Sequence, residues 1–242
     1  GVNCEMYDGP PVTLHANKAV ILATGGYGAN IEMVLGTNEY WNKEELSANI
    51  LTTNRSLAQG EGITMAQEVG AAVTGMGFTQ LMPLGWADDG KLAGGMGENV
   101  IFVSPAGTEN EGKRFVDESA ERDVLSQGQL TYGGENGLTI QLQNGGDNTS
   151  ANNREGKEYF CTLAEAAELT GISADVLRAT ITEYDTAYFN GELDSLDVPK
   201  SAANAPIGNY NEDGSFNEEG ILSVRYLAPS THHTMGGLVV DE

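Results

Sequence analysis

Positive charge is scarce in this chain. Its 242 residues include 12 lysines and arginines against 35 aspartates and glutamates, so the net charge at pH 7 is −23. Because nucleic acids and anionic membranes bind basic surfaces, this balance argues against both as partners. The acidic excess favours solubility, a high-salt or extracytoplasmic setting, or a basic redox partner, and these alternatives stay open.

Cysteines and long hydrophobic runs are also scarce. Cys4 and Cys161 offer no metal-ligand spacing and no disulfide framework, so we expect no metal site, although a bridge between the two stays open. No run of about 18 apolar residues occurs, which predicts no membrane insertion. The first residues carry no basic or apolar signal-peptide region, and the compartment stays unassigned.

What the chain does contain is enough apolar sequence to fold. Hydrophobic residues make up 40% of the chain, which suits one large domain or two small ones. Alternating or continuous apolar runs predict strands over 12–16, 18–23, 114–118, 138–142 and 238–240. Helical spacing predicts helices over 31–35, 61–70 and 119–129.

The clearest helix signals lie between residues 162 and 191. Thr162 and Glu165 form a capping-box pattern that predicts a short helix ending at Gly171. Ser173 is placed to cap a longer helix that runs through Asn190. A polar, glycine- and asparagine-rich loop is predicted over 143–153.

Two of the three histidines stand side by side near the end of the chain. His232 and His233 are followed by Gly236 and Gly237. Imidazoles offer hydrogen-bond donors or acceptors, and glycines allow a flat ligand to approach the backbone closely. The alternative is a polar loop that enters a strand through a glycine bulge.

Two further glycine turns are candidates for binding a dinucleotide. Ala23-Thr24-Gly25-Gly26 ends a predicted strand, and such turns let backbone amides approach phosphates or a sugar. Gly60-Glu61-Gly62 opens a predicted helix. The alternative role for Glu61 is purely local, because a carboxylate at a helix N-terminus is favoured by about 0.3–1 kcal/mol.

Four segments occur in the order found in one known family. They are AVILATGG at 19–26, QGEG at 59–62, KRFVDE at 113–118 followed by ERD at 121–123, and THHTMGG at 231–237. Together they resemble the soluble fumarate reductases, the flavocytochrome c group within the succinate dehydrogenase/fumarate reductase flavoprotein superfamily. The resemblance covers nearly the whole chain.

The resemblance implies an α/β fold with two parts. Residues 1–60 and 221–242 would be a discontinuous remnant of an FAD-binding Rossmann-like domain, and residues 70–220 would be an inserted helix-containing substrate-cap domain. The family's GxGxxG fingerprint is not present, so we expect the chain to be the middle of a longer flavoprotein that does not bind FAD by itself. An electron-donor domain or protein of haem or FMN type is a further expected partner.

The same resemblance implies which residues contact the cofactor and substrate. The backbone of His233 would lie along the isoalloxazine, and the remaining FAD contacts would come from Ala23, Thr24, Gly25, Gly26, Gly60, Glu61, Gly62, Gly236 and Gly237. His232 would hold a substrate carboxylate, and Arg122 would protonate the substrate carbon. The alternative for Arg122 is a salt bridge with Asp123, Glu121 or Glu118.

Two departures from the family pattern bear on the substrate. Met82 stands where the family histidine binds a second carboxylate, and a methionine cannot donate a hydrogen bond. The family's proton relay to Arg122 cannot be carried over, because no arginine lies between Arg55 and Arg114, although Glu98 is a candidate acid. We therefore expect Met82 and Trp86 to bind the apolar or aromatic end of an unsaturated monocarboxylate.

These observations predict an FAD-dependent reductase of an activated carbon–carbon double bond. Two alternatives stay open. In the first, the same fold catalyses the reverse reaction, as a flavin-dependent dehydrogenase, for example of a ketosteroid. In isolation, the chain is a catalytically inert cap or binding fragment.

Overall fold

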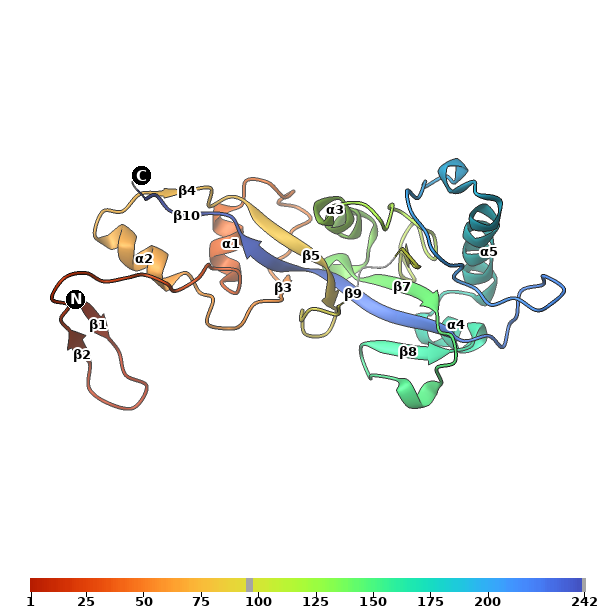
Figure 1. Ribbon diagram of the computed structural model, residues 1–242, viewed down its shortest axis with the longest axis horizontal. Helices are drawn as coiled ribbons and strands as arrows, with labels where there is room; N and C mark the ends of the chain where they lie inside the picture. Colours follow the sequence, from red (N-terminus) through yellow and green to blue (C-terminus); the bar gives the residue numbers. More distant parts are fainter. Residues whose placement is uncertain (95–97, 241–242) are drawn as a thin grey trace.

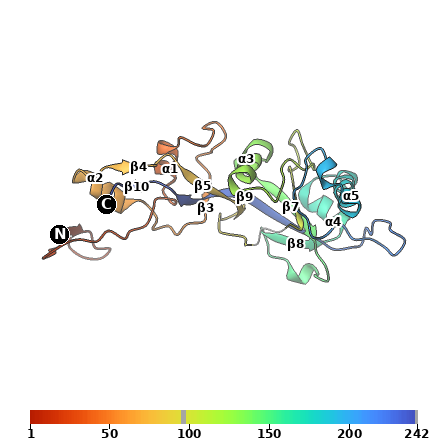
Figure 2. The ribbon, with the colours of Figure 1, turned by 45° about the horizontal axis from the view of Figure 1, so that its top comes forward.

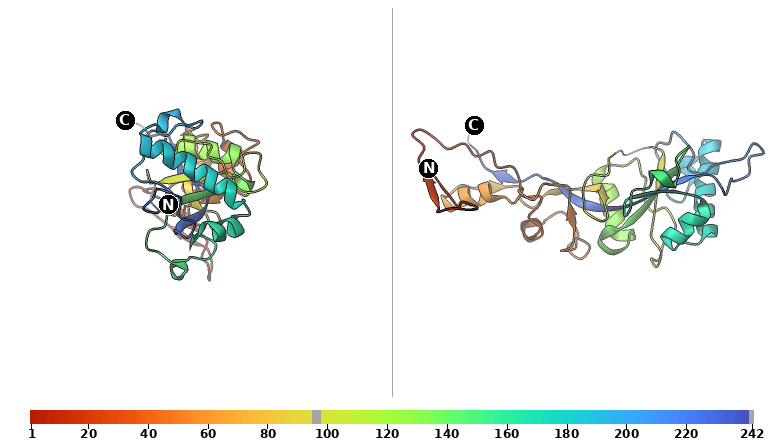
Figure 3. Two further views of the ribbon diagram at one scale, coloured as in Figure 1. Left: turned by 90° about the vertical axis from the view of Figure 1, so that its right-hand side faces the viewer. Right: turned by 90° about the horizontal axis from the view of Figure 1, so that it is seen from below.

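The computed structural model describes residues 1–94 and 98–240 and shows an elongated molecule (Figure 1). Figures 2 and 3 show the same long axis from other sides, and the end-on view is compact. The first residues and the last described strand lie at the same end of this axis. Within residues 1–94 and 98–240, no helix is both long and apolar enough to cross a membrane.

One long strand, β9 (Leu222–Thr234), runs through the middle of the molecule (Figure 1). Its first half pairs antiparallel with β7 and β8, and its second half pairs antiparallel with β5 and parallel with β3. A further strand, β6, pairs antiparallel with β7. The bounds of these partners are β3 Leu51–Thr52, β5 Thr79–Trp86, β6 Val100–Val103, β7 Thr139–Asn144 and β8 Glu158–Cys161.

Two prolines coincide with an irregularity between β5 and β9. Met82 lies opposite Ser230 and Gly85 lies opposite Ala228, so the register shifts between these two pairs. Pro83 and Pro229 fall inside this shift. Because proline has no N–H for the ladder, strands accommodate it at bulges and edges.

The described residues include five α-helices. Helix α3 packs against β5, while α4 and α5 pack against one another at the end of the molecule opposite the chain termini (Figure 1). The helices are α1 Ile31–Thr37, α2 Glu61–Glu68, α3 Arg122–Tyr132, α4 Leu163–Thr170 and α5 Ala174–Asn190. The remaining elements are β1 Val2–Cys4, β2 Val12–Leu14, β4 Val73–Thr74, β10 Gly237–Leu238 and the 3₁₀ turns Glu135–Gly137, Ser150–Asn152 and Leu193–Ser195.

The predicted caps of α4 and α5 are confirmed. Thr162 and Glu165 exchange both hydrogen bonds of a capping box, and the Ser173 hydroxyl accepts from the Val176 amide. Gly171 and Gly191 end the two helices in the left-handed conformation, which glycine adopts without steric cost.

The largest core cluster fills the space between these two helices and the sheet. Each fully buried aliphatic side chain contributes about 1.5–3 kcal/mol relative to an exposed one. Its buried members include Ile101, Ile140, Leu142, Leu163, Leu177, Ile181, Tyr184 and Val224. A smaller cluster joins Trp41, Leu46 and Ile50, from the loop after α1, to Leu81 of β5.

Two predicted strands are wrong. Residues 18–23 form no strand, and Ile21 is 89% exposed, because no described segment pairs with them. Residues 114–118 form only an isolated bridge between Arg114 and Val103. Of the predicted strand over 238–240, only Leu238 is in a strand, which pairs with Val73.

The predicted boundary at residue 221 falls at the start of β9. The first residues of this strand pair with β7 and β8, which lie inside the predicted cap over 70–220, and its last residues pair with β3 and β5. The sheet is therefore continuous across this boundary, and the division into 1–60, 70–220 and 221–242 stays a prediction.

Candidate active site

Arg122, the first residue of α3, lines a cavity of about 480 Å³. Four segments that are distant in sequence form this cavity: a loop after α1, the start of β5, the start of α3 and the residue after β9. The lining residues are Tyr40, Trp41, Phe78, Thr79, Gln80, Glu121, Arg122, Asp123 and Met235. A cation at a helix N-terminus is disfavoured by the helix dipole, so the position of Arg122 is not explained by helix stability.

The Arg122 guanidinium takes part in no salt bridge between residues that the structure describes. Its Nη1 donates a hydrogen bond of 3.3 Å to the neutral Oε1 of Gln80. Of the acids considered as alternatives, Glu118 is buried and pairs with Arg114 and Lys200, and Asp123 accepts from the Tyr40 hydroxyl. The structure therefore leaves the charge of Arg122 available to a ligand in the cavity.

His232 lies on β9, near enough to Arg122 for the charge of the guanidinium to affect its pKa. Burial lowers the pKa of His232, and the charges of His233 and Arg122 lower it further. The imidazole is therefore neutral at pH 7. His232 Nδ1 lies 2.6 Å from the Thr53 hydroxyl, and the rings of His232 and His233 stack with centroids 4.1 Å apart.

The proton arrangement at Thr53 decides what His232 can donate. The Thr53 hydroxyl is within hydrogen-bond distance of both His232 Nδ1 and the Thr231 carbonyl, at 2.6 Å and 3.2 Å, but it carries one proton. If that proton goes to His232 Nδ1, the neutral ring carries its own proton on Nε2 and can donate it to a carboxylate.

A second cavity, of about 380 Å³, gathers most of the predicted flavin-contacting residues. Three segments contribute, and none of the described lining residues is charged. They are Leu22, Ala23, Thr24, Gly25, Gly26, Gly62, Ile63, Thr234, Gly236, Gly237, Leu238 and Val240. The structure thus brings together glycines that the sequence separates by about two hundred residues.

The glycines of this second cavity fit part of a flat cofactor. A Cβ on Gly26 or Gly62 would stand 2.1 Å or 2.0 Å from a threonine hydroxyl of the neighbouring segment, so glycine is needed for the segments to close up. At Gly237 a Cβ would meet nothing within 4 Å and would project into open space. An uncharged, backbone-rich cradle of this kind suits the ring or phosphates of a dinucleotide.

The segment after β9 lines both cavities. Thr234 and Gly236 line the glycine-rich cavity, whereas Met235 lines the cavity of Arg122. Successive residues of an extended chain point to opposite sides, so Met235 faces away from its neighbours Thr234 and Gly236. His233 on β9 is exposed, Glu61 is exposed at the start of α2, and Gly60 caps that helix with φ of +82°.

The structure does not bring Met82 and Trp86 to the cavity of Arg122. Met82 is 3% exposed and belongs to a core cluster with Leu84, Trp86, Phe102 and Leu125. The Trp86 ring lies 4.8 Å, 5.4 Å and 4.7 Å from the charged groups of Arg154, Lys157 and Arg225. Apolar packing and cation–π contact explain both positions.

Sequence reasoning missed the side chains that do form the apolar wall of the Arg122 cavity. Phe78, Tyr40 and Met235 supply this wall, with exposed fractions of 46%, 52% and 58%. The two-residue spacing of Gln80 in β5 and Phe78 just before this strand is the signal that could have found them together. Tyr40 carries no such signal, because it comes from an irregular loop. Glu98, the candidate relay acid, accepts instead from Asn204.

The chain is similar to several flavin enzymes. It is 35% identical over 254 residues to an NADH:acrylate oxidoreductase from Vibrio harveyi, covering 100% of this chain and 23% of the relative. It is 32% identical over 242 residues to a urocanate reductase from Eggerthella lenta, and this match covers 93% of this chain and 36% of the relative. The chain therefore spans about a quarter to a third of the length of these relatives.

Solved structures share the fold. The open conformation of a flavocytochrome c3 fumarate reductase aligns with a TM-score of 0.68 and 24% identity, covering 93% of this chain and 37% of that one. A 3-ketosteroid Δ1-dehydrogenase from Sterolibacterium denitrificans aligns with a TM-score of 0.63 and 16% identity, and the alignment covers 97% of this chain and 45% of that one. The predicted α/β fold and the resemblance to fumarate reductase flavoproteins are confirmed. Since the model of the FAD binding domain family matches residues 1–242, the chain belongs to that family.

Proposed function

We propose that this chain supplies the substrate-binding residues and part of the flavin-binding residues of an FAD-dependent reductase. The reaction is the reduction of a carbon–carbon double bond conjugated to a carboxylate. The observation that carries the proposal is the Arg122 guanidinium, which lines a cavity without an ion-pair partner among the described residues. The relatives named for acrylate and urocanate reduction support the same reaction type.

The glycine-rich cavity would hold part of FAD through Gly25, Gly26, Gly236 and Gly237. Once reduced by the electron donor, bound FAD would supply the hydride that adds to one carbon of the double bond. Arg122 then gives a proton to the other carbon, which restores the charge balance. A guanidinium is a weak acid toward water, yet it can protonate the far more basic carbanion-like centre that hydride addition creates.

Gln80, which lines the cavity, and His232, which lies on β9 outside the described lining, orient this step. Gln80 holds the guanidinium by accepting from its Nη1, and His232 donates to the substrate carboxylate as a neutral imidazole. The fixed charge of Arg122 also stabilises the developing enolate. Since Arg122 is exposed, the guanidine regains its proton from water, and the relay that is absent from this sequence is not required.

The cavity lining favours a monocarboxylate over fumarate. Arg122 is the one cation among the lining residues that the structure describes, whereas Glu121 and Asp123 are both acids. A second carboxylate would face these acids without a donor, and an unpaired charge that loses water costs several kcal/mol. An apolar or aromatic substituent would instead contact Tyr40, Phe78 and Met235.

The test uses the full-length flavoprotein and reduced methyl viologen as electron donor. We expect a higher kcat/KM for acrylate or an aryl acrylate than for fumarate. A protein that reduces none of these acids, or prefers fumarate, would contradict the proposal. A haem- or FMN-type donor is proposed as the physiological electron source, and nucleic acid is not a proposed partner because the net charge is −23.

The dehydrogenase direction is the second candidate, because the ketosteroid dehydrogenase shares the fold. Arg122 favours reduction, since a guanidinium with its high pKa donates a proton to a carbanion more readily than it removes one from a saturated carbon. Turnover of a saturated acid or a ketosteroid with an artificial electron acceptor, without enoate reduction, would support the second candidate instead. An isolated chain that binds no flavin would support the inert-fragment alternative for this chain alone.

A further inference from the structure

The loop over residues 38–50 places one tyrosine beside the catalytic arginine. Asn38 and Trp41 exchange two hydrogen bonds, of 2.8 Å and 3.0 Å, and Trp41 Nε1 donates to the Thr79 carbonyl at 2.6 Å. The indole is 4% exposed within the core cluster that contains Leu46 and Leu81. Trp41 is thus an anchor, and it fixes the direction in which its neighbour Tyr40 points.

Tyr40 uses this fixed position to reach α3. Its hydroxyl donates to Asp123 Oδ2 at 3.0 Å, and its ring packs edge-on against Trp41 with centroids 5.0 Å apart. The same loop contacts α3 a second time, because Glu45 accepts from Gln127 Nε2 at 2.5 Å and from Thr131 Oγ1 at 3.1 Å. Loop 38–50 therefore holds the exposed face of the helix that begins with Arg122.

Asp123 is a potential competitor for the ligand of Arg122. Both residues line the same cavity, and they are adjacent in the chain. Neighbouring helical residues do not face one another, so a contact between them requires the long arginine side chain to swing away from Gln80. Without a hydrogen-bond partner, the Asp123 carboxylate would either pair with the Arg122 guanidinium or repel the carboxylate of an incoming ligand.

We propose that Tyr40 is a positioning residue that engages the Asp123 carboxylate and so keeps the Arg122 guanidinium available for a carboxylate ligand. This inference rests on the proposed carboxylate-binding function of the cavity. The raised pKa of Tyr40, caused first by its hydrogen bond to Asp123, agrees with a neutral hydroxyl donating to an ionised carboxylate. The contact joins residues 83 positions apart, which neither local helix nor loop structure requires.

The test compares Tyr40→Phe, Asp123→Asn and the double variant in the full-length flavoprotein. The probe is propionate, a saturated carboxylate that cannot be reduced, and its Kd is measured by calorimetry. Because Arg122 and Asp123 are both exposed and exposed ion pairs are weak, we expect Tyr40→Phe to raise the Kd by about two- to fivefold. Asp123→Asn should bind at least as tightly as the wild type, and the double variant should recover the wild-type Kd.

Rescue by the double variant separates positioning from a general structural effect. A Tyr40→Phe variant that is merely unstable would not be repaired by Asp123→Asn. Tyr188→Phe is the matched control, because Tyr188 lies on α5 at the far end of the molecule, where its hydroxyl donates to the Asn204 carbonyl. The Kd of this variant should match that of the wild type. An unchanged Kd in Tyr40→Phe, a double variant without rescue, or a wild type that binds no propionate would each overturn the inference.

A different result would contradict the proposed reductase activity. If the wild type binds propionate in a Tyr40-dependent manner but reduces no enoate with methyl viologen, the positioning role stands and the reductase proposal is wrong. If the wild type reduces enoates and the Kd is independent of Tyr40, the reductase proposal stands and the positioning role is overturned.

Discussion

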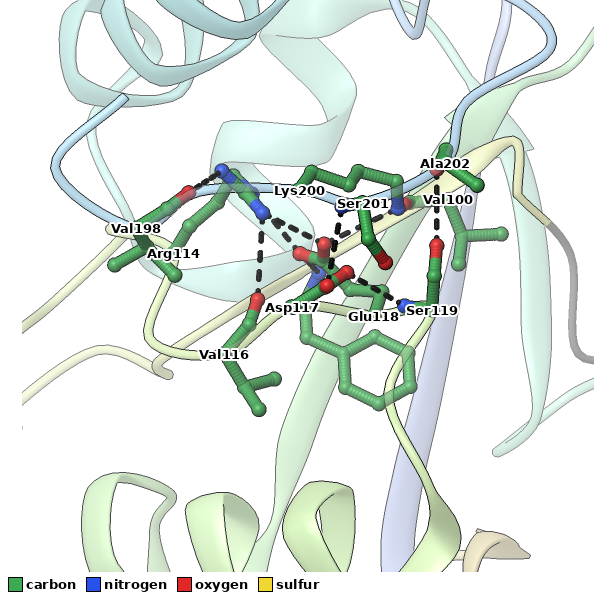
Figure 4. A network of polar contacts seen from close by, with 11 residues as sticks. Val100, Arg114, Val116, Asp117, Glu118, Ser119, Val198, Lys200, Ser201 and Ala202 are labelled. Carbon is green, nitrogen blue, oxygen red and sulfur yellow. Dashed lines mark hydrogen bonds and ion pairs between the residues drawn. The ribbon is translucent and has the colours of Figure 1, made fainter. Parts of the chain in front are cut away.

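Lys200 and Glu118, which are 82 positions apart, form a salt bridge of 3.1 Å in which both side chains are fully buried. Arg114 shares the Glu118 carboxylate through two hydrogen bonds, and the Phe102 amide donates to it as well (Figure 4). Lys200 Nζ also donates to the Val100 carbonyl at 2.8 Å. This network fixes the segment that leads into α3 and Arg122, although it does not itself line the cavity.

Glu118→Gln should be strongly destabilising. The substitution leaves the cations of Lys200 and Arg114 without their carboxylate in a site where burial already lowers the pKa of Lys200. Removing one partner of a buried ion pair typically costs about 3–5 kcal/mol. Urea unfolding would measure this loss. The exposed Glu109→Gln should stay within about 0.5 kcal/mol of wild type, and a loss below about 1 kcal/mol in Glu118→Gln would contradict the account.

Arg122→Lys should abolish most turnover in the full-length flavoprotein while flavin stays bound. The lysine keeps the charge but loses the planar fork that donates to Gln80. Removing a positioned general acid lowers rates by about 10²- to 10⁴-fold, so kcat for acrylate should fall by that order. Arg178→Lys on α5, where Arg178 pairs with Asp175 and Glu218, is the matched control. A near-wild-type kcat in Arg122→Lys would remove Arg122 from the chemistry.

Gly237→Ala should weaken FAD binding without weakening the fold. Its Cβ meets no atom within 4 Å and projects from a residue that lines the glycine-rich cavity. Filling space that a ligand needs typically costs about 1–3 kcal/mol, which corresponds to roughly a tenfold or larger rise in Kd for FAD. The readouts are flavin content and thermal unfolding of the full-length protein. Gly36→Ala on α1, also without a contact within 4 Å, should leave flavin content unchanged.

Cys161 should resist alkylation at pH 8 in the folded protein. Burial raises the pKa of its thiol to about 11, with the Glu165 charge as a further cause. Since the thiolate is the nucleophile, roughly one Cys161 side chain in a thousand is reactive at this pH. Peptide mass spectrometry after iodoacetamide treatment should show slow labelling that accelerates as the pH rises toward 11. Half-buried Cys4 and a urea-unfolded sample provide the comparisons, and equal labelling of both thiols in the folded state would contradict the prediction.

Helices with complete local signals were predictable from sequence. The capping box at Thr162 and the caps at Ser173 and Gly191 lie within a few residues of the turns that they stabilise, so α4 and α5 were predicted nearly to the residue. The strand predicted over 138–142 was also found from a local signal, the alternation of apolar and polar residues, and it corresponds to β7. Residues 18–23 have equally good strand composition, yet they form no strand because pairing requires a partner segment that sequence pattern does not supply.

The candidate site divides in the same way. Arg122, the histidine pair and the glycine turns could be assigned to one family of flavoproteins from the sequence, because those motifs are local strings. Long-range contacts were needed to show that Met82 is a core residue, that the Tyr40 hydroxyl donates to Asp123, and that Glu118 pairs with Arg114 and Lys200. Burial and long-range hydrogen bonds depend on which distant segments meet, and no local pattern of residues carries that information.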